Sequence, residues 1–153
     1  MCGISGFIGK KVNKEKMKVI VIMNDTRGKH SCGLYYDNLV FYGVDANSKM
    51  PDFLTSHQIP NKLKNPTIML AHSRSATMGT HTKENAHPIT IGLDEDNNYV
   101  TNRGDLPFLM VGVHNGVIKN YIDLRQRHLK ELDIVDFNID SKVLLGNIFL
   151  EKD

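Results

Sequence analysis

The sequence predicts a single domain of the α+β class that occupies residues 1–153. A chain of 153 residues is long enough to bury a substantial core. Apolar residues make up 41% of the chain and charged residues 24%, which is a usual balance for a soluble globular protein. Short apolar runs typical of strands are interspersed with segments whose apolar residues recur at helical spacing. Both kinds of element are therefore expected.

Eight short segments have the composition of strands. The first, Cys2–Ile8, is small and apolar, and its glycines indicate bends or close backbone approach. Leu34–Asp37 and Leu39–Gly43 form a predicted hairpin that turns at Asp37-Asn38. The remaining predicted strands are the buried runs Thr67–His72 and Phe108–Val113 and the shorter segments Ile89–Ile91, Tyr99–Thr101 and Val135–Ile139.

Three segments have helical patterns. Asn13 is a predicted N-cap for a helix over Lys14–Asn24, which we expect to cover one face of a sheet. Asp140 and Ser141 are expected to cap a final helix. Between them, an amphipathic helix over Ile118–Leu132 offers for packing the side chains of Tyr121, Ile122, Leu124, Leu129 and Leu132. The segment Asp25–Gly33 is predicted to be a loop, and the polar segment after Met50 to include one helical turn.

Several classes of function are disfavoured by composition. The net charge is +2, and no basic stripe with interleaved aromatic residues indicates nucleic-acid binding. No apolar run is long enough to span a bilayer and no signal peptide is visible, so we expect a cytoplasmic protein without membrane contact. Cys2 and Cys32 are the only cysteines, which does not suggest a disulfide framework. The spacing of cysteines and histidines predicts no metal site.

The most informative residue is Cys2, which becomes the N-terminal residue once Met1 is removed. It would then carry a thiol and a free α-amine together. With an unperturbed pKa of about 7.7–8.0 for the amine and about 8.5 for the thiol, the amine can accept the thiol proton at neutral pH. While Met1 is attached, the nitrogen of Cys2 belongs to an amide and cannot act as a base. A cysteine at this position alone specifies little.

Three further residues are candidates for a site. Arg74 follows a buried strand among small hydroxyl residues, where its guanidinium would suit a carboxylate. Asn115 and Gly116 end another buried strand and offer a side-chain amide and a backbone N–H as an oxyanion hole. The alternative is that Asn-Gly simply makes a turn. His87, within a turn, is more typical of a hydrogen-bonded structural histidine than of a catalyst.

Five stretches in order give the chain a family resemblance. They are Met1–Gly6, Arg27–Gly33, His72–Gly79 with Asn85–Pro88, His114–Gly116 followed by Ile118 and Asn120, and Asp140-Ser141. In this order they resemble the class II glutamine amidotransferases, whose glutaminase domain is an N-terminal nucleophile hydrolase. The resemblance covers nearly the whole chain. It implies a four-layer α-β-β-α sandwich of two antiparallel sheets, and it implies no cofactor.

The resemblance also implies roles for individual residues. Cys2 would attack the side-chain amide of L-glutamine, with Asn115 and the Gly116 N–H as the oxyanion hole. Hydrolysis of the resulting thioester would give glutamate, after ammonia has left. The remaining family positions would bind substrate: Arg74 and Thr77 at the α-carboxylate, Asp140 at the α-ammonium, and Arg27 and Gly28 beside the nucleophile.

Differences from the family pattern bear on activity and partners. Ser75 stands where the family often has an aromatic residue, Met78 where it often has histidine, and His30 where it has an acidic residue. These differences leave the nucleophile in place and predict a glutamine pocket that closes less well. The alternative function is therefore a catalytically weak glutamine-binding or regulatory homologue.

The chain ends early relative to the family. Only 13 residues follow Asp140. Family domains usually continue with further elements, so we expect a short domain with an open sheet edge that could pair with a partner or another copy. No synthase domain is visible, so the acceptor of ammonia is expected on a separate polypeptide.

Overall fold

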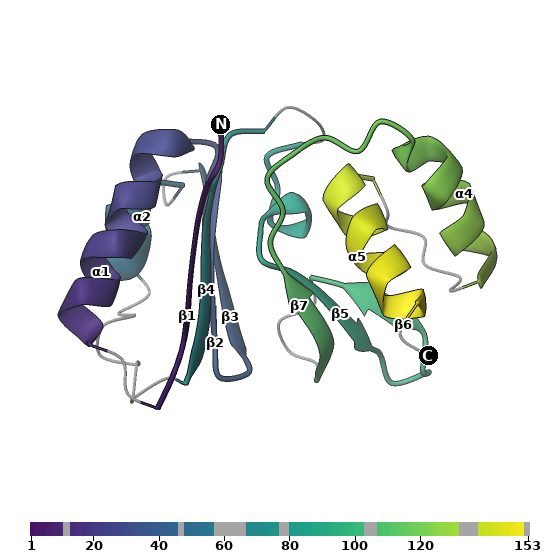
Figure 1. Ribbon diagram of the computed structural model, residues 1–153, viewed down its shortest axis with the longest axis horizontal. Helices are drawn as coiled ribbons and strands as arrows, with labels where there is room; N and C mark the ends of the chain where they lie inside the picture. Colours follow the sequence, from purple (N-terminus) through teal and green to yellow (C-terminus); the bar gives the residue numbers. More distant parts are fainter. Residues whose placement is uncertain are drawn as a thin grey trace.

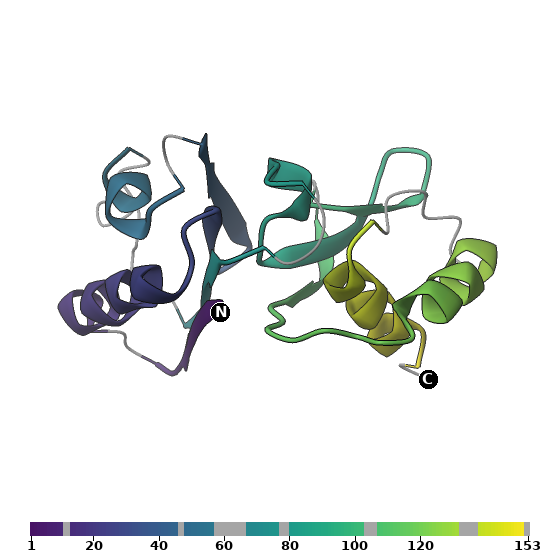
Figure 2. The ribbon, with the colours of Figure 1, turned by 90° about the horizontal axis from the view of Figure 1, so that it is seen from above.

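Two antiparallel sheets form the centre of the protein in the computed structural model (Figure 1). The structure describes residues 1–10, 13–45, 48–56, 67–76, 80–102, 107–131 and 138–151. Helices lie on the outer side of each sheet, and the two sheets face each other between them (Figure 1). Each sheet together with its helices forms one half of the molecule. Viewed from above, the N-terminus lies close to the junction between the two halves (Figure 2). The predicted α+β class is therefore confirmed, with two antiparallel sheets.

The larger sheet has four strands in the order β1-β4-β2-β3, and we call it sheet A. All its neighbours are antiparallel. Its strands are β1 (Gly3–Ile8), β2 (Ser31–Tyr36), β3 (Leu39–Val44) and β4 (Ile68–Arg74). The β2–β3 hairpin turns at Asp37 and Asn38, which have φ values of 41° and 68°. Positive φ at both residues is what a two-residue hairpin turn requires, and the predicted hairpin is confirmed.

The smaller sheet has three strands in the order β6-β5-β7, and we call it sheet B. Its strands are β5 (Ile89–Leu93), β6 (Tyr99–Thr101) and β7 (Phe108–Gly112). Both strand pairs are antiparallel, and the β5–β7 register shifts between Ile91 and Gly92. Within the described residues, β5 is the only strand paired with β7. The opposite edge of β7 therefore has no described strand beside it.

Four described α-helices cover the outer faces of the sheets. They are α1 (Lys14–Met23), α2 (Met50–Ser56), α4 (Tyr121–Glu131) and α5 (Asp140–Leu150). Two 3₁₀ turns, η1 (Asn24–Arg27) and η3 (Lys83–Asn85), complete the described elements. Asn13 caps α1, because its side chain accepts a hydrogen bond from the Lys16 N–H at 3.0 Å. None of the described helices is long and apolar enough to cross a membrane.

Each sheet has its own hydrophobic core against its own helices. Sheet A packs on α1 and α2 through a cluster in which Leu34, Met50 and Phe53 are at most 1% exposed. Sheet B packs on α5 through Ile89, Ile91 and Leu145, and a smaller cluster around Val143 joins α5 to α4. The space between the sheets is therefore separate from both cores, and the candidate site lies there.

Several boundaries differ from the sequence-based expectation. Ser31-Cys32-Gly33 belongs to β2 and not to a loop, because these residues pair with Gly43 and Val44 on one side and with β4 on the other. Strand β4 continues to Arg74, two residues beyond its predicted end. Asp140 and Ser141 do not cap α5: the N-cap is Ile139, and its side chain makes no capping bond.

The packing of the amphipathic helix is partly as predicted. Tyr121 and Leu124 pack against the Val143 cluster. Ile122 is 57% exposed and does not pack as predicted, because it lies on the outer side of α4. The predicted packing residues Leu129 and Leu132 and most of the predicted strand Val135–Ile139 lie outside the described side chains and residues.

Candidate active site

Cys2 is held at the start of β1, next to the end of β4. The β1–β4 register pairs Gly3 with Ser73, which fixes the residue before Gly3 beside the residues after Ser73. The Cys2 Sγ accepts a hydrogen bond from the Ser75 N–H at 3.3 Å and lies 3.6 Å from the Ser75 carbonyl oxygen. An N-terminal residue tied into a sheet has a defined position, which a terminal nucleophile requires.

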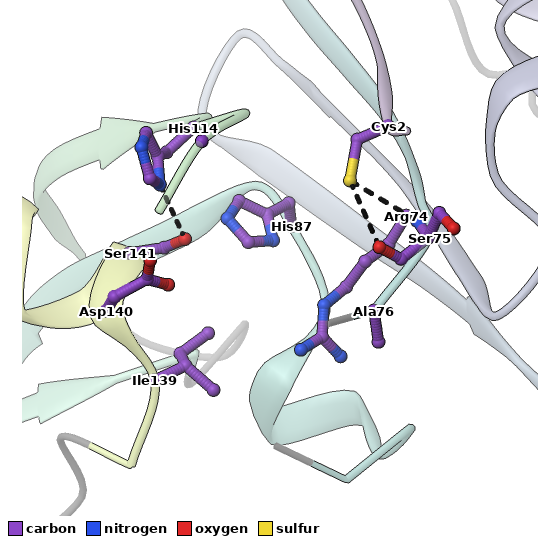
Figure 3. Close-up of a pocket in the computed structure, with 10 residues that line it drawn as sticks. Cys2, Arg74, Ser75, Ala76, His87, His114, Ile139, Asp140 and Ser141 are labelled. Atoms are coloured by element: carbon purple, nitrogen blue, oxygen red, sulfur yellow. Dashed lines mark hydrogen bonds between the residues drawn. The ribbon is translucent and has the colours of Figure 1, made fainter. Parts of the chain in front are cut away.

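Cys2 lies at the edge of a pocket between the two sheets (Figure 3). Sheet A contributes Cys2 and the end of β4, and sheet B with α5 contributes the opposite wall. The lining residues are Cys2, Arg74, Ser75, Ala76, His87, His114, Gly116, Ile139, Asp140 and Ser141. Four residues that the sequence predicted for one site, Cys2, Arg74, Gly116 and Asp140, thus lie around one pocket.

Arg74 is the cation of this pocket. It is 5% exposed, and its Nη1 donates to the Thr80 carbonyl at 3.1 Å. Burial lowers the pKa of its guanidinium, while the nearby Cys2 and Asp140 oppose that shift. Because arginine has a very high unperturbed pKa, the side chain stays charged. The pocket therefore holds a positive charge on the sheet A side.

Asp140 is the anion of the opposite wall. It is the first residue of α5 and is 7% exposed. Its Oδ2 accepts the Ile118 N–H at 3.0 Å, so the carboxylate ties the segment after β7 to α5. Next to it, the Ser141 Oγ lies 3.0 Å from the His114 Nδ1. Arg74 and Asp140 place opposite charges on opposite walls, which suits a zwitterionic ligand such as a free amino acid.

Asn115 and Gly116 follow β7 and reach the nucleophile from the sheet B side. The Asn115 Nδ2 donates to the Cys2 carbonyl at 3.3 Å. Gly116 lines the pocket, and a Cβ there would lie 2.8 Å from the His114 Nε2. A larger residue at position 116 would therefore have to displace the His114 ring.

Arg27 and Gly28 lie behind Cys2 and not in the pocket lining. The Arg27 Nε donates to the Cys2 carbonyl at 3.2 Å, and its Nη2 lies 3.7 Å from the Met1 Sδ. A Cβ at Gly28 would overlap the Ser73 carbonyl, so only glycine allows this loop to lie against β4. Arg27 therefore holds the terminal segment, and Gly28 allows its loop to lie against the end of β4. Thr77, the remaining predicted substrate residue, lies outside the described residues.

His87 has surroundings that its sequence context did not predict. It is 3% exposed, it lines the pocket, and its ring stacks on His72 with centroids 4.3 Å apart. Neither ring nitrogen of His87 has a hydrogen-bond partner among the described residues, contrary to the predicted hydrogen-bonded histidine. Burial lowers the pKa of His87 well below its usual value and that of His72 to about 4. Both rings are neutral at neutral pH.

The pocket also contains residues to which the sequence assigned no catalytic or binding role. The backbone N–H of Ser75 donates to the Cys2 sulfur, and a backbone contact cannot be predicted from the type of side chain. His114 precedes Asn115 and Ser141 follows Asp140. Their position next to predicted site residues is the only feature of the sequence that could have indicated them. Among the described residues, no group of three or more His, Cys, Asp or Glu side chains is arranged to hold a metal ion.

The chain is similar in sequence to glutamine–fructose-6-phosphate aminotransferases (isomerizing) from several organisms. Identity is 30% over 132 residues with the protein of Methanosarcina mazei, covering 86% of this chain. It is 28% over 149 residues with that of Bartonella quintana and 28% over 145 residues with that of Bacillus subtilis, covering 94% and 95% of this chain. The chain spans only about a fifth of the length of these relatives. No family model matches it.

The chain is homologous to class II glutamine amidotransferases, and the homology covers as much as 95% of its length. The resemblance predicted from the five motif stretches is thereby confirmed. The relatives that carry it are glutamine–fructose-6-phosphate aminotransferases, of which this chain matches one portion.

Proposed function

We propose that this chain is a glutaminase domain that hydrolyses the side-chain amide of L-glutamine and delivers ammonia to an acceptor on another polypeptide. The observation that carries the proposal is one pocket that Cys2, Arg74 and Asp140 line together, with Cys2 and Arg74 on one side and Asp140 on the other (Figure 3). The homology to class II amidotransferases supports the same reaction. The arrangement of two facing sheets with outer helices agrees with a four-layer α-β-β-α sandwich, which we propose as the fold type (Figure 1).

The first step is substrate binding. The α-carboxylate of glutamine would bind the Arg74 guanidinium, with Thr77 assisting, and the α-ammonium would bind Asp140. These two contacts would select a free amino acid over a glutamine residue inside a peptide, because a peptide lacks one or both charges. The side-chain amide would then extend toward Cys2.

The second step is attack by Cys2. With Met1 removed, the free α-amine takes the thiol proton, directly or through a water, and the thiolate attacks the amide carbon. The Asn115 Nδ2 and the Gly116 N–H would receive the developing oxyanion, an interaction that contributes about 3–4 kcal/mol to barrier lowering. Asn115 would move from the Cys2 carbonyl or share its second N–H.

The third step is collapse and hydrolysis. The α-ammonium of Cys2 returns its proton to the nitrogen of the substrate amide. The C–N bond then breaks, and this nitrogen leaves as ammonia. A glutamyl thioester remains on Cys2. The α-amine then accepts a proton from water, the hydroxide attacks the thioester carbon, and glutamate leaves as the thiol is re-formed.

The experiment that tests this proposal is glutamate release by the purified chain. Intact mass first establishes whether Met1 is absent. The processed chain is expected to release glutamate from L-glutamine, and Cys2→Ala is expected to release none above background. Equal rates in the two proteins would disprove the role of Cys2. Cys32→Ala is the matched control, because Cys32 is buried and burial raises the pKa of its thiol to about 12.

A second candidate function is glutamine binding with little turnover. It is favoured by the position of Asn115. The side-chain amide of this residue donates to the Cys2 carbonyl, and Asn115 is not among the residues that line the pocket. Calorimetry on the Cys2→Ala protein separates the two. Glutamine binding without glutamate release by the parent chain would favour the second candidate, and the absence of binding would remove both.

A further inference from the structure

Two consecutive backbone N–H groups beyond the end of β4 are bonded on opposite sides. Ser75 and Ala76 follow β4, which lies between β1 and β2 in sheet A. On the β1 side, the Ser75 N–H donates to the Cys2 Sγ at 3.3 Å (Figure 3). On the β2 side, the Ala76 N–H donates to the His30 Nδ1 at 2.9 Å. This segment is therefore held between Cys2, just before β1, and His30, just before β2.

The ring of His30 takes the place of a backbone acceptor. The β2–β4 pairing ends at Ser31 and Arg74, and beyond it the His30 N–H still donates to the Arg74 carbonyl at 3.0 Å. The next donor on this side, the Ala76 N–H, is bonded to the imidazole and not to a carbonyl. A ring nitrogen that accepts a hydrogen bond carries no hydrogen, so His30 is neutral with its hydrogen on Nε2. The ring thus extends the ladder by one hydrogen bond past the last strand pair.

His81 fixes the orientation of this ring. It stacks on His30 with the ring centroids 4.2 Å apart and an angle of 11° between the planes. The residue before it, Thr80, is held in turn, because its carbonyl accepts the Arg74 Nη1 at 3.1 Å and its hydroxyl accepts the Asn85 Nδ2 at 3.0 Å. His81 therefore has an anchored neighbour, and the stack keeps the Nδ1 of His30 in a constant direction.

We propose that His30 is a positioning residue for the nucleophile. By holding Ala76, it keeps the neighbouring Ser75 N–H directed at the Cys2 sulfur. His30 is not among the residues that line the pocket, so it acts through this backbone segment and not on the substrate. This role rests on the glutaminase function proposed above, because the sulfur concerned is the one that would attack glutamine.

The Ser75 N–H matters most once the sulfur is charged. A hydrogen bond to an ionised acceptor is stronger than one between neutral groups, so this donor holds the thiolate better than the thiol. A misplacement of about 1 Å near the reacting atoms can lower a rate by about a hundredfold. Arg74 keeps its contacts with the Thr80 carbonyl and the His30 backbone when the ring is absent. Binding of the α-carboxylate should therefore change little.

Two substitutions at His30 separate the hydrogen bond from the rest of the side chain. In His30→Asn the amide oxygen stands as many bonds from the backbone as Nδ1 does, so the acceptor is retained. In His30→Gln the oxygen lies one bond further out and cannot take the same place. With glutamine as substrate, His30→Gln should lower kcat by about ten- to a hundredfold at nearly unchanged KM, and His30→Asn should stay within about threefold of the parent chain. Lys29→Gln, at the exposed neighbouring position, should keep full activity.

Amide hydrogen exchange, followed by NMR without glutamine, gives a readout that needs no turnover. His30→Gln should make the Ser75 and Ala76 amides exchange about tenfold faster, and His30→Asn should restore both to the parent rates. Cys2→Ala should accelerate exchange at Ser75 alone, because the sulfur is the acceptor of that N–H. The Leu34 amide in β2 is the reference for an intact sheet A and should be unchanged throughout.

Failure of this inference and failure of the glutaminase function give different results. If the parent chain releases no glutamate, the glutaminase proposal fails, and the Ser75 exchange rates still decide the role of His30. Faster exchange at Ala76 alone, with Ser75 exchange as in the parent, would overturn the positioning role and leave His30 as a local structural contact. His30→Asn behaving like His30→Gln would overturn it too, because the retained acceptor would then have no effect.

Discussion

The two sheets of this protein contribute different chemistry to one pocket. Sheet A supplies the thiol of Cys2 and the cation of Arg74, while the segments around sheet B supply the backbone of Gly116 and the Asp140 carboxylate. Each sheet packs on its own helices through its own core. Neither half therefore forms a complete substrate pocket by itself. Activity should depend on the junction, and stability on the two cores.

The largest effect is expected from removing the sheet B contribution to catalysis. Asn115→Ala should lower kcat by about 10²–10³-fold with KM nearly unchanged, because one oxyanion donor is lost and no contact to the charged ends of glutamine changes. Steady-state kinetics with glutamine measures this. Lys119→Ala, at an exposed position a few residues on, is the control and should retain full activity. A pure KM effect would show that Asn115 acts in binding.

The sheet A contribution should affect binding more than turnover. Arg74→Lys keeps the charge and loses the planar two-bond contact to a carboxylate, so KM should rise about tenfold or more while kcat changes less. Arg127→Lys on the exposed side of α4 is the matched control. An equal loss of kcat at unchanged KM would contradict the assignment of Arg74 to the α-carboxylate.

The junction itself can be tested at Gly33. A Cβ at this residue of β2 would overlap the carbonyl oxygen of His87, which belongs to the other half. Gly33→Ala should therefore separate the halves, with a loss of about 1–3 kcal/mol in the free energy of unfolding and a loss of glutaminase activity. Gly6→Ala is the control, because its Cβ would meet the Leu70 side chain at 3.3 Å. Urea unfolding of the two variants makes the comparison.

The smallest effect is expected from the stacked pair His72 and His87, one from each half. Their folded pKa values lie below the usual 6.5, so the unfolded chain binds more protons below about pH 6.5 and stability falls as pH falls. Because the pKa of His72 is lowered to about 4, it should cost about 1 kcal/mol between about pH 7 and about pH 5.5. His87 acts in the same direction.

Urea unfolding at the two pH values measures this dependence. His72→Asn should flatten it, since the titrating group is removed. The exposed His81→Gln should leave it unchanged. An identical slope in His72→Asn would show that other groups dominate the acid sensitivity of the fold.

Much of the fold could be predicted from the sequence because local patterns determine it. The helix after Asn13, the hairpin at Asp37-Asn38 and the strands before Arg74 and His114 were all predicted close to their observed bounds. Each depends on neighbouring residues alone. The start of β2 was missed, since Ser31-Cys32-Gly33 looks like a polar, glycine-rich loop and is ordered by pairing with β4.

The site was only partly predictable for a similar reason. Cys2, Arg74, Gly116 and Asp140 could be named from their motifs, and they lie around one pocket. The thiol contact with the Ser75 backbone and the burial of His87 against His72 could not, because neither depends on residues near each other in sequence. Such contacts exist only once the two sheets are placed together.

The most direct test of the central claim is covalent labelling with a glutamine analogue that carries an electrophile at its side chain. Peptide mass analysis of the processed chain should find the adduct on Cys2 and none on Cys32, whose thiol is buried. Excess L-glutamine should protect Cys2, and Arg74→Ala should slow the labelling strongly. An adduct on Cys32, or labelling of Cys2 that neither glutamine nor Arg74→Ala affects, would contradict the account.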